Sequence, residues 1–269
     1  MSWHATEYRA SHQRVAQIVE QHLLDHFTGA IDCITQIDVE RYKHARTHAD
    51  AAPGTVTKEL RTLKAILNRA HQLGMIAINP AALVRAPKSL NHRKGFAFFS
   101  TADLACIYNT GTIEPWHKYA WMLYAGTGAR RQELLNLKWA DVDDRTIHLI
   151  STGEERTKSG EGRDVPISTG AREALAYFRT WDGKSDLYVL PRVHASSLSR
   201  VAARCIRRAG LKGSLHTFRH TFLSHLAADP RIPIVAIKTW AGHSTIRVTE
   251  QYMHMRESAS DDILRELKL

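Results

Sequence analysis

A polar and basic segment without helical periodicity, residues 85–95, divides the chain and is the feature that most constrains its fold. On both sides of it, apolar residues recur at helical spacing between Pro-Gly, Asn-Pro and glycine breaks. We therefore expect residues 85–95 to link two domains, residues 1–84 and residues 96–269. A chain of 269 residues is long enough for each of them to bury a core.

The first part is expected to form a small all-helical bundle. Residues 11–28 have the period of an amphipathic helix, and Thr35 with Asp38 has the spacing of a capped helix start. A third helix is expected to be capped by Thr55 and ended by Gly74. Basic residues of this helix are candidates to contact a phosphate backbone, although a solvated surface explains each one about as well: Lys58, Arg61 and Lys64. Arg93 and Lys94 of the linker are candidates for the same contact.

The second part is expected to be mostly helical with a small three-stranded antiparallel sheet, so that the whole chain is mainly α (α+β). Ser100 with Asp103 predicts the first helix start of this part. Strands are expected at residues 146–151, 156–157 and 163–167. Helices are expected at about residues 115–126, 170–180, 196–208, 216–228 and 233–241, followed by a short one that carries Tyr252.

The charge balance indicates a polyanionic partner. The chain has 37 Lys and Arg against 27 Asp and Glu, a net charge of +10. Residues 1–94 contain 13 basic and 8 acidic residues, and residues 95–269 contain 24 and 19. Since both halves carry the same excess, the pattern favours a basic clamp around DNA over a basic tail on a neutral enzyme.

The three cysteines are widely spaced and form no CxxC pair, which is typical of reduced thiols in a cytoplasmic protein. No run approaches 18 apolar residues, and the first ten residues lack the apolar region of a signal peptide. We therefore expect a cytoplasmic protein that does not enter membranes.

Several side chains have the chemistry needed to break a phosphodiester, which requires a nucleophile, positive charge at the non-bridging oxygens and a proton for the departing oxygen. Arginine supplies the charge without a metal, because its planar fork meets two phosphate oxygens at once. Arg130 stands at a helix start, where Glu133, three residues on, could hold its guanidinium. Its neighbour Arg131 points about 100° away around the helix and is interpreted as a surface residue.

His216 and Arg219 are three residues apart and project from the same side of one helix. His220 also lies within reach of His216, and an HxxxH pair can bind zinc, but no glutamate follows His216 as in HExxH. Lys158 is expected at a hairpin tip, where a lysine is either solvated or able to donate a proton. Tyr252 has polar neighbours, which argues against simple burial in the core.

Together these motifs resemble the tyrosine recombinases of the phage integrase family. The likeness rests on three groups of residues, and the first part is similar to that family's helical core-binding (SAM-like) domain. The three groups are residues 125–139, residues 215–222 with Ala241-Gly242-His243-Ser244 and Tyr252, and residues 157–160 with 163–167.

The resemblance implies a site-specific DNA recombinase whose catalytic residues are Arg130, Lys158, His216, Arg219, His243 and Tyr252, supported by Glu133. It implies that Tyr252 attacks the scissile phosphate, giving a 3′-phosphotyrosine and a free 5′-hydroxyl. Arg130 and Arg219 would bind the non-bridging oxygens and His243 would hydrogen-bond the phosphate, while His216 would handle the tyrosine proton and Lys158 would protonate the 5′-oxygen.

The resemblance also implies double-stranded DNA as partner, with strand exchange through a Holliday junction in a homotetramer on two duplexes. Without DNA, a monomer or weak oligomer is expected. No cofactor, metal or ATP is expected, and the protein would lie in the cytoplasm, associated with the nucleoid when bound. An apolar final helix, residues 261–269, would dock on a neighbouring subunit or on its own domain. The chain begins close to the core-binding helices, so no arm-site DNA-binding domain is expected.

Three alternatives stay open from the sequence. A topoisomerase that swivels and reseals one strand would use the same phosphate chemistry. A catalytically silent relative would only occupy DNA. A metal-dependent nuclease would need acidic ligands, and the acidic clusters of this chain lie in predicted turns or at a terminus.

Overall fold

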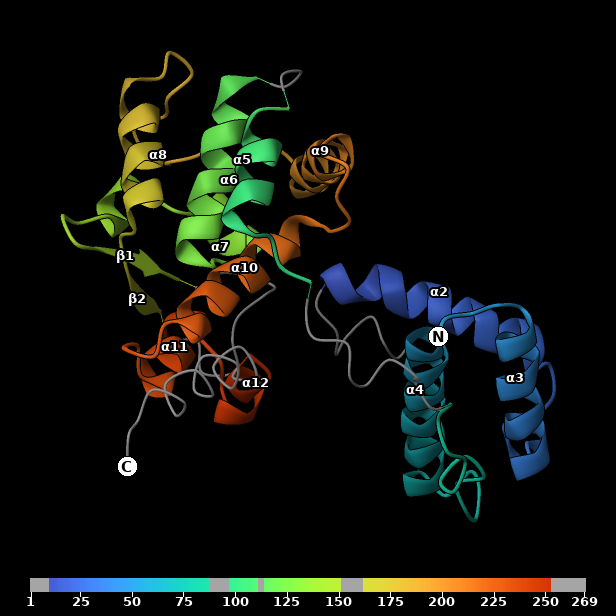
Figure 1. Ribbon diagram of the computed structural model, residues 1–269. Helices are drawn as coiled ribbons and strands as arrows, with labels where there is room; N and C mark the ends of the chain where they lie inside the picture. The colour runs from blue at the N-terminus through green and yellow to red at the C-terminus, as the bar shows by residue number, and fades with distance from the viewer. Residues whose placement is uncertain (1–9, 88–96, 111–113, 151–161, 253–269) are drawn as a thin grey trace, which may run out of the picture. The chain divides into compact units, whose positions relative to one another are not determined.

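The chain divides into two compact units, Met1–Lys94 and Gly95–Leu269, each with its own cluster of buried apolar side chains. The computed structural model describes residues 10–87, 97–110, 114–150 and 162–252 (Figure 1). The two units are considered separately.

The described residues of the first unit form helices α2 (Ala10–His26), α3 (Gln36–His48) and α4 (Pro53–Gln72), with a 3-10 turn η1 (Ile31–Cys33). The expected cap of α3 is confirmed, because Thr35 and Asp38 form a reciprocal capping box. The expectation that Thr55 caps α4 is wrong. This helix begins at Pro53, because the proline ring presets the helical φ and lacks only an N–H that the first turn would leave unpaired.

The second unit is built around α6 (Pro115–Thr127), which packs against α8 (Thr169–Thr180) and α10 (Leu215–Ala228). Figure 1 shows α5 (Thr101–Tyr108) beside α6 and α10 passing across their ends. Ring stacking holds α6 on α10, since Trp121 lies 5.8 Å from Phe218 between ring centroids. The other helices among the described residues are α7 (Arg131–Leu135), η2 (Trp139–Asp141), α9 (Ala195–Arg208), α11 (Ile234–Ala241) and α12 (Ile246–Glu250).

A small antiparallel sheet joins β1 (Thr146–Leu149) to β2 (Arg163–Pro166), with Leu149 opposite Arg163. Ile147 and Leu149 of β1 are buried on either side of the exposed His148, which is the period-2 pattern of a sheet with one face on the core. In β2, Arg163 and Val165 are buried on either side of the exposed Asp164. Three strands were expected, whereas the described residues contain two. The expected middle strand, residues 156–157, lies outside the described residues.

The last described helix, α12, ends at Glu250, so Tyr252 follows it in a turn and does not lie within the helix as expected. Residues 261–269 lie outside the described part of the chain. In that described part, every helix is too short or too polar to cross a lipid bilayer.

Candidate active site

The turn after α6 brings Arg130 to the site. Gly128 ends this helix with φ 60°, in the left-handed region that glycine adopts without strain. A Cβ built on Gly128 would lie 2.3 Å from Cδ1 of Phe222, so only glycine fits against α10 there. After the turn, the backbone N–H of Arg130 donates to the Glu133 carboxylate at 2.7 Å and fixes the start of α7.

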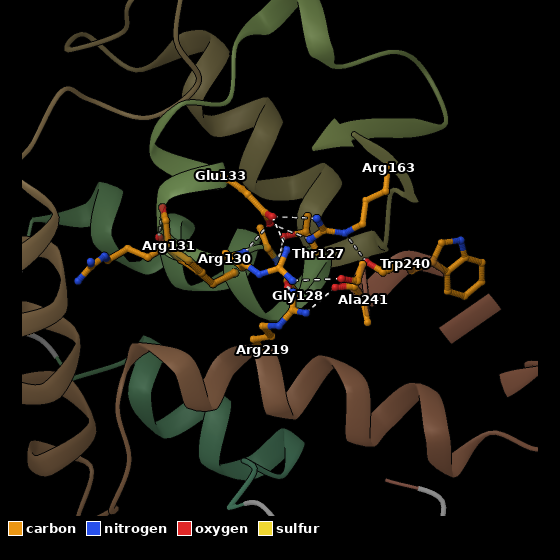
Figure 2. A network of polar contacts seen from close by, with 12 residues as sticks. Thr127, Gly128, Arg130, Arg131, Glu133, Arg163, Arg219, Trp240 and Ala241 are labelled. Atoms are coloured by element: carbon orange, nitrogen blue, oxygen red, sulfur yellow. Dashed lines mark hydrogen bonds and ion pairs between the residues drawn. The ribbon is translucent and has the colours of Figure 1, made fainter. Parts of the chain in front are cut away.

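Glu133 is the centre of the site, and its side chain is only 2% exposed. One carboxylate oxygen, Oε1, accepts from Nη1 of Arg130 at 2.7 Å and from Nη1 of Arg163 at 2.9 Å. The other, Oε2, accepts from Nη2 of Arg163 at 2.7 Å as well as from the Arg130 backbone. Figure 2 shows these contacts converging, with Arg131 directed away from them.

The C-terminal end of α11 contributes three consecutive carbonyls, those of residues 240–242, and each accepts from a different arginine. Nε of Arg163 donates to the carbonyl of Trp240 at 2.7 Å, and Nη2 of Arg130 to that of Gly242 at 3.1 Å. Nη2 of Arg219 donates to the carbonyl of Ala241. The last carbonyls of a helix lack intrahelical partners and carry partial negative charge, which explains why cations gather there.

Arg219 lies on α10 and is almost fully buried, with Nη1 also donating to the carbonyl of Gly128. Burial, together with the charges of Arg130 and Arg163, lowers the pKa of Arg219 to about 9, so the guanidinium stays charged at neutral pH. Burial alone would raise the pKa of the Glu133 carboxyl, but hydrogen bonds and charge from Arg163 and Arg130 hold it well below its usual range. The cluster therefore has three positive charges and one negative charge.

Tyr252 is buried, contrary to the expectation from its polar neighbours, and its hydroxyl is hydrogen-bonded to Nδ1 of His220 at 2.6 Å. Burial raises the pKa of Tyr252 to about 12, although the charge of Arg219 acts in the opposite direction. Burial and the neighbours His216 and Arg219 lower the pKa of His220 to about 4. The phenol is therefore protonated at neutral pH and the imidazole is neutral. In the His220 tautomer that carries its proton on Nε2, the hydroxyl donates and Nδ1 accepts.

His216 and His243 flank this pair. The His216 ring lies 4.6 Å from the ring of His220, and burial lowers its pKa, with Arg219 and Arg130 acting in the same direction. Nδ1 of His243 hydrogen-bonds Oγ1 of Thr249 at 3.0 Å, and its ring is stacked 6.5 Å from that of Tyr252. Burial and the nearby arginines lower the pKa of His243 to about 4, so it is neutral at pH 7.

An open pocket of about 330 Å³ adjoins the cluster and is lined on one side by Arg130 and His216. Arg131 lines it too, and Nη1 of Arg131 donates to Oγ of Ser199 at 3.2 Å. The pocket therefore gives solvent access to the more exposed of the two expected phosphate-binding arginines, whose side chain is 28% exposed.

The other predicted residues are less completely described. Lys158, Arg93 and Lys94 lie outside the described residues. Lys58 and Arg61 are exposed on α4, whereas Lys64 is half-buried and donates from Nζ to the carbonyl of Ala82 at 3.1 Å, so it is less free to meet DNA than expected. Among the residues that the structure describes, no group of three or more His, Cys, Asp or Glu could hold a metal ion.

Sequence reasoning missed the roles of Arg163 and His220. The burial of Arg163 could have been predicted, because it lies two residues before Val165 and so on the same, buried face of a strand. A charged residue on a buried face requires a partner of opposite charge. His220 had been weighed only as a zinc ligand. A stripe of exposed arginines at helical spacing along α9 was also missed, and its members are Arg200, Arg204, Arg207 and Arg208.

Known proteins resemble this chain both in sequence and in fold. Residues 100–259 match the model of the phage integrase family. The tyrosine recombinase XerC of Erythrobacter litoralis (strain HTCC2594) is 31% identical over 225 residues, which cover 77% of this chain and 70% of that protein.

Two solved structures have a similar fold. The Tn1549 transposon integrase in complex with a circular intermediate DNA superposes with a TM-score of 0.80 at 20% identity, over 98% of this chain and 96% of that one. A lambda integrase tetramer bound to a Holliday junction gives a TM-score of 0.75 at 17% identity, over 90% of this chain and 74% of that one. At these identities the likeness concerns the fold.

Proposed function

Because the chain belongs to the phage integrase family, and is therefore a site-specific DNA recombinase that cleaves and rejoins DNA, we propose that its nucleophile is Tyr252. The observation that carries this proposal is the arginine cluster around Glu133, with an excess of two positive charges beside a protonated phenol. A phosphodiester brings one negative charge, and the transition state at phosphorus brings more. Fixed guanidinium groups in a buried site stabilise such charge without reorganisation.

In the proposed reaction the Tyr252 oxygen attacks phosphorus and the bond from phosphorus to the 5′-oxygen breaks, leaving a 3′-phosphotyrosine. Arg130 and Arg219 stabilise the non-bridging oxygens, and His243 donates a hydrogen bond to one of them. The 5′-oxygen leaves as a hydroxyl with a proton from Lys158. Attack by a 5′-hydroxyl of another strand reverses these steps and restores the protein.

We assign the Tyr252 proton to His220, in place of His216 as the family resemblance implied. The support is the 2.6 Å hydrogen bond from the Tyr252 hydroxyl to Nδ1 of His220. Because the phenol has a pKa of about 12 and the imidazole one of about 4, the proton stays on the phenol before attack. It therefore moves to His220 only as the bond from oxygen to phosphorus forms.

We further propose that catalysis needs neither metal nor ATP, because the arginines supply the positive charge and the covalent phosphotyrosine keeps the energy of the broken bond. Cleavage should persist in EDTA without nucleotide. The partner is double-stranded DNA in the cytoplasm, contacted by the exposed arginines of α9 and by Lys58 and Arg61. The fold shared with lambda integrase, which was solved as a tetramer bound to a Holliday junction, supports a homotetramer as the exchanging species.

The test is covalent capture of DNA. The protein is incubated with random-sequence duplexes that carry a nick, so that a short strand diffuses away after cleavage and the adduct accumulates. DNA that stays attached after denaturation is sequenced, and mass spectrometry identifies the modified residue. We expect Tyr252 to carry the DNA, and Tyr252→Phe to bind DNA without forming an adduct.

Tyr119→Phe is the matched control, because Tyr119 is a half-buried tyrosine that stacks on Tyr177 away from the arginine cluster. It should form adduct at the rate of the unsubstituted protein. Adduct formation by Tyr252→Phe, or DNA attached to any other residue, would remove Tyr252 as nucleophile. Strand exchange between two captured duplexes then distinguishes recombination from the swivelling of one strand.

A further inference from the structure

Arg163 is a buried arginine with a partner for each of its three nitrogens. It begins β2 and, like Val165, points to the core side of the sheet. Its two terminal nitrogens bind both oxygens of Glu133, and its Nε binds the carbonyl of Trp240. A bidentate arginine–carboxylate pair in a buried site has fixed geometry as well as high strength.

This pairing changes the charge that Arg130 can offer to DNA. Glu133 orients Arg130 through its backbone and its side chain. If Glu133 had no other cation, its negative charge would cancel that of Arg130, and the arginine would attract a phosphate only weakly. Arg163 supplies the compensating charge, because it meets the same two oxygens from the other side.

We propose that Arg163 is a positioning residue that acts through Glu133. It neutralises the carboxylate that orients Arg130, so that Arg130 keeps a full positive charge for the scissile phosphate. This inference rests on the proposed function, since it assumes that Arg130 meets that phosphate.

A contact with α11 holds the Arg163 side chain in place beside Glu133. Through Trp240 it ties β2 to the end of α11, where Arg130 and Arg219 bind the next two carbonyls. The segment that follows carries His243 and Tyr252. The packing is tight, because a Cβ on Gly242 would lie 3.0 Å from Cδ of Arg163. The contact with Trp240 thus fixes the Arg163 guanidinium, so that its two terminal nitrogens stay on the Glu133 carboxylate.

The experiment measures the single-turnover rate of adduct formation on captured target DNA for a double-mutant cycle. Arg163→Met in the unsubstituted protein should slow the reaction on the order of 10²-fold, as expected for a lost contribution to oxyanion stabilisation. In a Glu133→Gln background, Arg163→Met should change the rate less than about threefold, because the carboxylate that Arg163 neutralises is already absent. A further loss of tenfold or more in that background would overturn the proposal.

A second substrate separates charge from general damage to the fold. In a methylphosphonate at the scissile position one non-bridging oxygen is replaced by a neutral methyl group, so the reaction needs less positive charge. The defect of Arg163→Met should shrink at least tenfold on this substrate, whereas Kd for DNA stays within a few-fold. Equal slowing on both substrates would mean that Arg163 only maintains the structure and would overturn the proposal.

Arg231→Met is the matched control, because Arg231 also pairs with a carboxylate, that of Asp229, but at an exposed position. Arg231→Met should leave the rate of adduct formation unchanged on both the phosphodiester and the methylphosphonate substrate. If Arg163→Met alone does not fold, the cycle is completed with Glu133→Gln and the double variant, in which the buried carboxylate that Arg163 neutralises is absent. Absence of any adduct in the unsubstituted protein would instead refute the proposed function.

Discussion

At the scale of single residues, the site depends on arginine as opposed to lysine. Arg130, Arg163 and Arg219 each bridge two or more acceptors, using different nitrogens of a planar fork with five donors, whereas the three donors of an ammonium group lie on a single nitrogen. Arg219 uses this to satisfy two backbone carbonyls while nearly all of its surface is buried. A lysine there would have to reach both carbonyls from one nitrogen, and it would lose its proton more readily when buried.

The assignment of the tyrosine proton to His220 can be tested against His216. We expect His220→Gln to slow adduct formation on the order of 10²-fold, the usual contribution of a general base. His216→Gln should slow adduct formation less, because the Tyr252 hydroxyl is hydrogen-bonded to the ring of His220. Single-turnover rates measured from pH 5 to 9 decide between them, and a larger loss for His216→Gln than for His220→Gln would reverse the assignment.

The half-buried His220 and His243 also predict how stability depends on pH. An unfolded histidine takes up a proton near pH 6.5, whereas burial and positive neighbours lower the folded pKa of His220 and of His243 to about 4. The unfolded chain therefore binds more protons below pH 6.5, and the free energy of unfolding falls as the pH falls. The loss is at most about 1.4 kcal/mol per pH unit for each histidine.

Urea unfolding of the second unit between pH 6.5 and 5 measures this slope, in a range where most carboxyls are still ionised in both states. His243→Asn should reduce the slope by up to one histidine's contribution. His48→Asn, at the exposed end of α3, is the control and should leave it unchanged. A slope that is the same in all three proteins would show that His243 titrates alike in the folded and unfolded chain.

At the scale of elements, two helices are each followed by a glycine, and carbonyl groups at their C-terminal ends accept hydrogen bonds from arginines. α6 ends at Gly128 and α11 at Gly242, with φ of 60° and 63°. A left-handed residue at these ends turns the chain sharply, so that the carbonyls near the helix end face the cluster and not a further turn of helix. Arg219 binds the carbonyls of Gly128 and Ala241 and thereby connects the two helix ends.

Substitution of Gly128 tests how tightly α6 and α10 are joined. Gly128→Ala should lower the free energy of unfolding by about 2–5 kcal/mol, from left-handed strain and from the overlap with Phe222. Gly210→Ala is the control, because Gly210 has φ +75° but a Cβ there meets no atom within 4 Å, so only about 1–2 kcal/mol of strain is expected. Chemical unfolding gives both values, and equal losses would mean that the contact with Phe222 relaxes freely.

At the scale of the whole molecule, the chain has two units, each with its own hydrophobic core. The two units carry equal excesses of positively charged residues. The first core is centred on α4, whose Leu60, Leu63 and Leu67 are buried together. The second contains the large aromatic side chains of α6 and α10 and supports the arginine cluster. The arginine cluster therefore lies in the second unit, while the first adds basic surface.

Separate cores predict separate responses to core mutations. Leu67→Ala should destabilise the first unit by about 2–5 kcal/mol, because it leaves a cavity at a fully buried position, and should leave the second unit unaffected. Leu123→Ala in α6 should do the converse. Calorimetry should show two unfolding transitions, of which each variant shifts one. A single transition shifted equally by both variants would mean that the two units unfold as one.

The sequence by itself determined the features that depend on neighbours along the chain. The caps at Thr35 and Ser100 were predicted from spacing, as was the pairing of Arg130 with Glu133 three residues on. Helical periodicity located most of the helices, because it reports which side of an element avoids water. The family likeness drawn from the motifs is confirmed by the match over residues 100–259.

Only the tertiary structure decided which distant groups meet. Arg163 lies 30 positions from Glu133, and His220 lies 32 positions from Tyr252. Periodicity marks a buried face but does not identify the element that covers it, so neither contact could be predicted. The protonation of Tyr252 follows from the same cause, because its pKa depends on burial among segments that come together only in the folded chain.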